Sequence, residues 1–166
     1  MGSIALGVES RILNVGIIGC GELTQVVHIP TLVFLSDQFR ITYLCDISPG
    51  ALQHCQKRVV GVLAPQLTDD PTQLCASPLV DVVLVASPDE YHADYAVLAL
   101  EHNKSVFAEK PLALNMKDIE RVVAAEKASQ GQFMVGYMRR YAPAFQDVLK
   151  EIGGMDKIVY ARVRGE

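Results

Sequence analysis

A pair of glycines marks the first place where the residue types could do chemistry. Gly19 and Gly21 are separated by one residue and directly follow the apolar run Ile12–Ile18, and Glu22 and Leu23 then begin a helix-like stretch. Glycine permits a sharp turn out of a strand and lets the backbone approach a ligand closely. Because amides at a helix N-terminus bind anions, this segment is typical of a phosphate site.

Asp46 is the second candidate, at the end of an expected strand over residues 40–45. A carboxylate there can accept hydrogen bonds from both hydroxyls of a ribose, and its charge repels a 2′-phosphate. No Arg or Lys stands beside it, since Ile47, Ser48 and Pro49 follow. The pattern therefore favours NAD over NADP. The alternative is a solvated aspartate that caps the next helix, and one residue could serve both roles.

Two more segments follow the ends of expected strands. Ser87 and His92 come after one apolar run, and Glu109 and Lys110 come after the next. Ligands of open α/β sheets bind at the carboxyl ends of the strands. A lysine held there could hydrogen-bond a substrate hydroxyl and stabilise its developing alkoxide. Taken alone, Glu-Lys-Pro is a common surface tripeptide, and His92 and His28 would each more often be ordinary histidines.

The elements that must position these residues alternate between strands and helices. The expected strands are 12–18, 40–45, 65–68, 80–86, 105–108 and 133–137, and the expected helices cover about 23–35, 48–60, a short stretch from 71, 90–102 and 115–129. This alternation predicts right-handed β-α-β units and a doubly wound, mostly parallel sheet. The fold class is therefore α/β.

The last part of the chain follows a different pattern. Residues 143–152 predict a helix that Gly153 and Gly154 end, and Lys157–Arg164 alternates apolar and polar residues. That alternation is typical of a half-exposed strand in an antiparallel sheet. A lone strand with an apolar face favours association, so we expect self-association or a partner chain there. We therefore expect a dinucleotide-binding domain over 12–140 and the truncated start of a second domain over 141–166.

Composition limits the classes of partner. The net charge of −4 and the lack of a Lys/Arg run argue against nucleic acid. No segment approaches the ~18 apolar residues that a membrane span needs, and the first eleven residues do not resemble a secretory signal. We expect a cytoplasmic protein that acts on a small molecule. The four cysteines have no metal-binding spacing, so buried reduced thiols and no metal are expected.

Five segments, in this order, carry a resemblance to a known family: GIIGCGELTQVVHIP, CDISP, VASPDEYHADYAVLAL, FAEKPLALN and VGYMRRYAPAF. Together they resemble the glucose–fructose oxidoreductase, inositol dehydrogenase and MocA-like family over about residues 12–145. The resemblance implies an NAD(P)-binding Rossmann domain and a second α/β domain. It also implies an oxidoreductase that transfers a hydride between the nicotinamide cofactor and a sugar, polyol or similar hydroxyl or carbonyl substrate.

The resemblance also implies roles for individual residues. Lys110 would be the catalytic residue near the nicotinamide, Asp46 would take the adenosine ribose, and Arg140 would lie at the crossing into the second domain. The implied cofactor residues are Gly19, Gly21, Glu22, Leu23, Asp46, Ser87, His92, Glu109, Lys110 and Arg140.

Two features depart from the family pattern. Thr24 stands at the third fingerprint position, where a small residue lets helix and strand pack closely. The sequence also has no counterpart of the family region that supplies the proton-transferring histidine. Two alternatives therefore stay open, a regulatory protein that binds the dinucleotide without turnover and an NAD-dependent glycoside hydrolase.

Overall fold

The computed structural model describes residues 11–59, 61 and 63–158, which form two compact units. The units divide between Val135 and Gly136, five residues before the domain boundary expected from the sequence. The first unit holds the sheet and its covering helices. The described part of the second unit holds one ten-residue α-helix and two short 3-10 turns.

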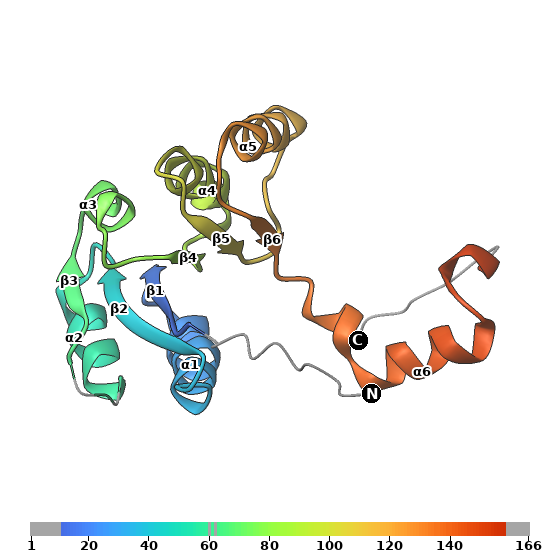
Figure 1. Ribbon diagram of the computed structural model, residues 1–166, viewed down its shortest axis with the longest axis horizontal. Coiled ribbons are helices and arrows are strands. Elements are labelled where there is room, and N and C mark those ends of the chain that lie inside the picture. Colours follow the sequence, from blue (N-terminus) through green and yellow to red (C-terminus); the bar gives the residue numbers. More distant parts are fainter. Residues whose placement is uncertain (1–10, 60, 62, 159–166) are drawn as a thin grey trace, which may run out of the picture. The chain divides into compact units, whose positions relative to one another are not determined.

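The sheet of the first unit has six strands in the described part of the chain, all parallel. They are β1 (Leu13–Ile18), β2 (Phe39–Cys45), β3 (Gln66–Thr68), β4 (Val82–Val85), β5 (Ser105–Ala108) and β6 (Phe133–Val135). Their order in space is β3-β2-β1-β4-β5-β6 (Figure 1). This is the doubly wound Rossmann order, with the reversal of direction between β1 and β4. The expected α/β fold class is confirmed.

Helices cover both faces of this sheet (Figure 1). Side chains of α1 and α2 pack with one set of buried strand residues, and those of α3, α4 and α5 pack with the other. The helices are α1 (Ile29–Phe34), α2 (Pro49–Arg58), α3 (Pro71–Ala76), α4 (His92–Glu101) and α5 (Met116–Ala128). Because both faces of the sheet are covered, the central strands β1 and β4 are mainly apolar rather than alternating.

Local capping explains where several helices begin. The side chains of Ser48, Asp70 and Asn115 each accept a backbone N–H from the first turn of the helix that follows. Pro49 and Pro71 occupy first helical positions, where the missing N–H costs no hydrogen bond. The expected N-cap at Asn115 is confirmed. The helix after β2 begins where expected and ends at Arg58.

The first helix is less regular than the sequence predicts. It contains a wider π-helical turn at Thr24–His28, in which the N–H of Ile29 donates to the carbonyl of Thr24, and only then continues as α1. Pro30 follows directly. In a regular α-helix its ring would clash with the carbonyl four residues earlier, and the wider turn relieves this contact.

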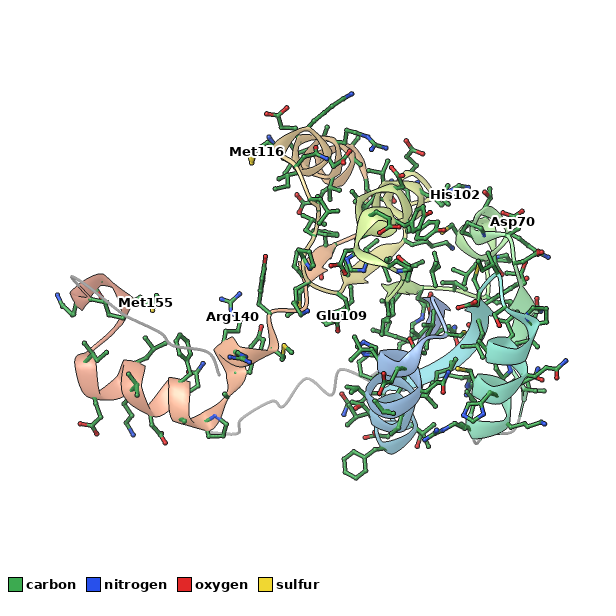
Figure 2. The ribbon with its side chains drawn as sticks, turned by 180° about the vertical axis from the view of Figure 1, so that it is seen from behind. Asp70, His102, Glu109, Met116, Arg140 and Met155 are labelled. Atoms are coloured by element: carbon green, nitrogen blue, oxygen red, sulfur yellow. The ribbon has the colours of Figure 1, made fainter. Side chains whose placement is uncertain are left out.

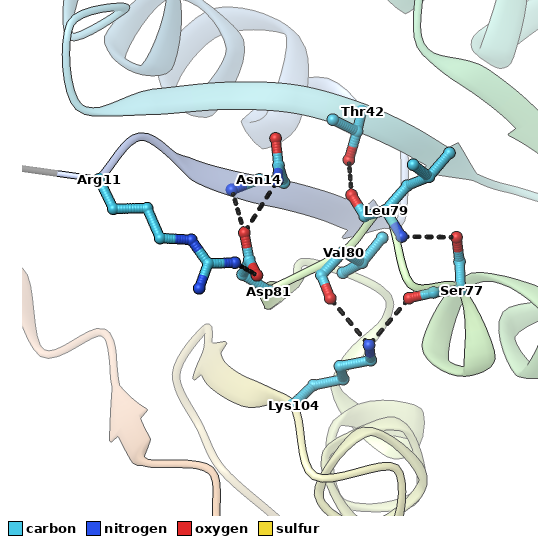
Figure 3. A network of polar contacts seen from close by, with 8 residues as sticks. All are labelled: Arg11, Asn14, Thr42, Ser77, Leu79, Val80, Asp81 and Lys104. Carbon is cyan, nitrogen blue, oxygen red and sulfur yellow. Dashed lines mark hydrogen bonds and ion pairs between the residues drawn. The ribbon is translucent and has the colours of Figure 1, made fainter.

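At the amino ends of the central strands, polar side chains bond to other groups of the protein (Figure 3). The Asp81 carboxylate accepts hydrogen bonds from Arg11 at 2.5 Å and from the backbone and side chain of Asn14, both at 2.9 Å. The Lys104 ammonium donates to two carbonyls of the loop before β4, each at 2.8 Å, and the Thr42 hydroxyl donates to a third at 2.7 Å. These contacts fix the entry of the chain into β4.

The second unit contains α6 (Pro143–Ile152), as expected from the sequence. The helix ends at Gly153, whose φ of 84° is the left-handed conformation that favours glycine. A short 3-10 turn over Met155–Lys157 follows. The strand expected over Lys157–Arg164, and with it the expected association surface, lies almost entirely outside the described residues.

Two general features of the first unit bear on function. All four cysteines are free and buried, as expected, and burial raises the pKa of Cys45 and Cys75 to about 12 each. In the part of the chain that the structure describes, no helix is long and apolar enough to cross a membrane.

Candidate functional site

Backbone hydrogen bonds align the residues that leave the carboxyl ends of the strands. On one side of the sheet, the N–H of Gly19 donates to the carbonyl of Cys45 at 2.9 Å, and the N–H of Asp46 donates to the carbonyl of Thr68 at 3.1 Å. On the other side, the N–H of Ala86 donates to the carbonyl of Ile18 and the N–H of Glu109 to the carbonyl of Val85, each at 2.9 Å. In each pair, the first residue after one strand is held by the end of its neighbour. The sheet therefore places Asp46, Gly19, Ser87 and Glu109 in a row in that order, one per strand.

The glycine turn after β1 is tight on one side and open on the other. Gly19 has a φ of 98°, and a Cβ there would lie 2.5 Å from the carbonyl oxygen of Ala86. A Cβ at Gly21 would meet nothing within 4 Å. Gly19 is thus required by the fold, whereas Gly21 keeps a surface free for a ligand.

Thr24 stands at the third fingerprint position, where the family has a smaller residue, and the structure shows how its side chain is accommodated. Thr24 is fully buried, and its hydroxyl donates to the carbonyl of Gly19 at 2.6 Å. The amide of Gln25 donates to the carbonyl of Cys20 at 2.8 Å. The larger residue is accommodated because its polar atom is satisfied, and both side chains bond carbonyls of the turn rather than its N–H groups.

Asp46 connects the glycine turn to the start of α2. Its Oδ2 accepts the N–H of Cys20 at 2.7 Å and its Oδ1 accepts the N–H of Ser48 at 2.8 Å. Ser48, rather than Asp46, caps α2. A carboxylate has about four acceptor sites, so Asp46 retains capacity for further hydrogen bonds.

His92 begins α4, as one of its two ordinary interpretations expected, but it lies inside the protein rather than on the surface. Its side chain is fully buried, with Nδ1 2.7 Å from the carbonyl of Pro111 and Nε2 2.8 Å from the carbonyl of Ser87. The ring therefore bridges the loop after β4 and the loop after β5. Its role in this structure is to hold these two loops together.

Glu109 and Lys110 follow β5 with opposite environments. The Glu109 side chain is buried, and its Oε1 lies 3.1 Å from Nε2 of His28. Its Oε2 accepts the N–H of Lys110 at 3.3 Å. The Lys110 side chain is exposed, and the Lys110–Pro111 peptide is cis. A buried carboxyl group and an exposed ammonium thus stand side by side.

A cleft of about 570 Å³ joins these residues into one site. It is lined by nine of the ten residues expected to bind the cofactor: Gly19, Gly21, Glu22, Leu23, Asp46, Ser87, His92, Glu109 and Lys110. A second hollow of about 270 Å³ shares Gly19, Asp46 and Ser87, and is also lined by Asp69 and by Tyr91 and Tyr95, whose rings stack 6.0 Å apart. Arg140 belongs to the second unit, whereas Glu109 belongs to the first (Figure 2).

His28, which the sequence analysis expected to be an ordinary histidine, does not line the cleft but contacts Glu109, which does. It sits at the end of the π-helical turn, and its ring meets Phe107 edge-on at 6.2 Å. The only sequence signal is Pro30 two residues later, which disturbs the helix that carries His28.

Among the described residues, no group of three or more His, Cys, Asp or Glu side chains could hold a metal ion.

The family assignment follows from a sequence profile described as "Oxidoreductase family, NAD-binding Rossmann fold", which matches residues 13–137. The chain belongs to this GFO/IDH/MocA family. Residues 13–137 are accordingly its NAD-binding Rossmann domain, in agreement with the strand order and the glycine turn.

Individual relatives are dehydrogenases. The chain is 32% identical to an inositol 2-dehydrogenase of Paracoccus denitrificans over 158 residues, covering 92% of this chain and 46% of that protein. It is 35% identical to inositol 2-dehydrogenase of Salmonella typhimurium over 130 residues, covering 78% of this chain and 38% of that protein. The chain thus spans less than half the length of these curated relatives.

Solved structures show the same fold. An oxidoreductase of Thermotoga maritima superposes with a TM-score of 0.80 at 27% identity, over 86% of this chain and 43% of that one. The myo-inositol dehydrogenase of Lactobacillus casei, solved with NAD(H) and myo-inositol, superposes with a TM-score of 0.79 at 27% identity, over 86% and 42% of the two chains.

Proposed function

We propose that this chain binds NAD along the carboxyl edge of its sheet and serves an oxidoreductase that acts on a polyol, sugar or related hydroxyl or carbonyl compound. The observation that carries the proposal is the single cleft lined by the glycine turn, Asp46, Glu109 and Lys110. The inositol dehydrogenases among the relatives support the substrate class.

The order of the strand ends supports one orientation of the bound cofactor. The amides that begin the helix after Gly19 would bind the pyrophosphate. Asp46 would bind the adenosine ribose with its remaining acceptor sites, and its charge disfavours the 2′-phosphate of NADP. The adjoining hollow beside Tyr91 and Tyr95 would take the adenine, because stacked aromatic rings offer a base a flat apolar surface.

The nicotinamide would then lie on the other side of the glycine turn, toward Ser87 and Glu109. Here Lys110 would donate a hydrogen bond to the substrate oxygen and stabilise negative charge on it. Bound NAD would supply the hydride acceptor. In the oxidation direction the cofactor would take the hydride from the carbinol carbon and the hydroxyl proton would pass to solvent, so that the products would be a carbonyl compound and NADH.

Calorimetric titration of the 166-residue chain with NAD and with NADP tests the cofactor site directly. We expect saturable binding of both, with NAD bound more tightly. No binding of either nucleotide at millimolar concentration would overturn the proposal. Because the titration measures binding alone, its result does not depend on turnover.

Formation of NADH from inositols and other polyols tests the catalytic part. Lys110→Met should abolish NADH formation while NAD binding persists, because the ammonium acts on the substrate. Lys117→Met removes a lysine from the first turn of α5 and is the matched control. NAD binding without NADH formation from any polyol would favour the non-catalytic alternative instead.

A further inference from the structure

The buried contact between His28 and Glu109 joins the helix after the glycine turn to the loop after β5. The two side chains are 11% and 12% exposed, and the atoms Nε2 and Oε1 lie 3.1 Å apart. The nitrogen is nevertheless a buried polar atom without an aligned hydrogen bond among the described residues. The two side chains are therefore in direct buried contact, which holds the Glu109 carboxyl group beside the helix that carries His28, although the alignment of a hydrogen bond between them is poor.

At neutral pH, His28 carries no positive charge that could balance the negative charge of the Glu109 carboxylate. Burial lowers the pKa of His28, and the neighbouring Glu109 carboxylate only partly opposes that shift. Desolvation has the larger effect, so the ring is neutral near pH 7 and above. Glu109 is the charged group that faces His28 from the loop after β5, and Phe107 contributes only an uncharged ring.

The rest of the cleft is also predominantly acidic. Its lining includes four carboxylates and one lysine, namely Glu22, Asp46, Asp89, Glu109 and Lys110. Glu109 differs from the other three carboxylates because it is buried, whereas Glu22 and Asp89 are exposed and Asp46 is partly exposed. A buried charge is screened less by salt and solvent than an exposed one.

The position of Glu109 along the row of strand ends decides which part of the cofactor it would face. Asp46 follows β2 and Glu109 follows β5, on opposite sides of the glycine turn after β1. With the pyrophosphate on the turn and the adenosine toward Asp46, the nicotinamide would lie toward Glu109. The nicotinamide ring carries a positive charge in the oxidised cofactor and none in the reduced cofactor.

We propose that the Glu109 carboxylate, positioned by His28, makes this cleft favour the oxidised cofactor over the reduced one. This inference rests on the proposed function, because it requires the nicotinamide at that end of the cleft. Glu109 then acts as a specificity-determining residue for the redox state of the cofactor. Lys110, which is exposed beside it, remains available to the substrate.

Titration with NAD+ and with NADH at pH 8 tests the proposal on the parent chain and on Glu109→Gln. Gln keeps the shape of the side chain and removes its charge. We expect the ratio of the two dissociation constants to shift against NAD+ by about tenfold or more, because the interaction of two unit charges about 4 Å apart corresponds to roughly fivefold in water and roughly a thousandfold near a protein surface. Glu101→Gln removes an exposed carboxylate from the end of α4 and should leave the ratio unchanged.

A second variant keeps the test decisive if Glu109→Gln does not fold. Replacing a buried ionisable pair by apolar residues of similar size is often tolerated, so His28→Leu/Glu109→Leu should fold and show the same shift. An unchanged ratio in a variant that binds both nucleotides would overturn the inference and leave the cofactor site intact. If the parent chain binds neither nucleotide, the proposed function fails and the inference fails with it.

Discussion

The two ends of one sheet use charged residues in opposite ways. At the amino end, Asp81 accepts three hydrogen bonds and Lys104 donates two, all to groups of the protein (Figure 3). At the carboxyl end, Asp46 accepts two and keeps acceptor capacity, and Lys110 is exposed. A polar group whose partners are all internal supports the fold, whereas one with spare capacity can bind a ligand.

Substitution in the glycine turn should have the largest effect, because it should reduce both stability and NAD binding. In Gly19→Ala, the new Cβ would meet the backbone of Ala86 and the residue would keep a φ that L-residues avoid. We expect a loss of unfolding free energy of about 3 kcal/mol or more, measured by urea denaturation, and no detectable NAD binding. Gly21→Ala is the matched control: it should keep the stability and weaken NAD binding alone. A fully stable Gly19→Ala protein would contradict the account.

At the amino end, Asp81→Ala should reduce stability without changing the affinity for NAD. The substitution leaves the Arg11 and Asn14 donors without their acceptor, which costs about 2 kcal/mol in urea denaturation. Asp37→Ala removes an exposed aspartate and should have no measurable effect. A weaker affinity for NAD in Asp81→Ala would show that the two ends are not separable.

At the carboxyl end, Asp46→Ala should show the reverse behaviour. We expect NAD to bind about tenfold more weakly and its advantage over NADP to narrow, because both the ribose acceptor and the repulsive charge are lost. Stability should fall by only about 1 kcal/mol, through the lost bonds to the N–H groups of Cys20 and Ser48. Asp46→Asn separates charge from shape. An unchanged preference in calorimetric titration would show that Asp46 only braces the turn.

The smallest expected effect concerns pH. Since burial lowers the pKa of His28, the unfolded chain binds a proton more readily than the folded chain below pH ~6.5. The contribution of His28 to stability is thus present above that pH and is lost as the pH falls. Urea denaturation at pH 8 and at pH 5.5 should show a smaller acid-induced loss in His28→Gln than in the parent chain. An equal loss in both would contradict a neutral buried ring.

The sequence predicts the fold of the first unit well because its signals are local. Apolar runs of strand length, Pro49 and Pro71 at helix starts, and Asn115 as an N-cap each specify an element without reference to distant residues. The α/β alternation then determines a parallel sheet, since β-α-β connections are short and have one hand. The π-helical turn was not predicted, because it depends on how Pro30 and Thr24 are accommodated together.

The site was predictable where a residue follows a strand and not where two distant segments meet. Asp46, Ser87 and Glu109 each follow an apolar run, so the edge they share is visible in the sequence. The environments of His92 and His28 depend on contacts across 19 and 81 positions of the chain, with Pro111 and Glu109 respectively. No local pattern specifies such contacts: the residues alone predicted two ordinary histidines, and only the family resemblance implied a cofactor role for His92.

Chemical-shift mapping on the 15N-labelled chain tests the contrast between the two ends most directly. On addition of NAD, we predict that the amides of Gly19, Gly21, Asp46, Ser87 and Glu109 shift as the nucleotide saturates the cleft. The amides of Asn14, Asp81 and Lys104 should keep their positions. Shifts confined to the amino end, or no shifts at either end with millimolar NAD, would contradict the assignment of the carboxyl edge as the cofactor site.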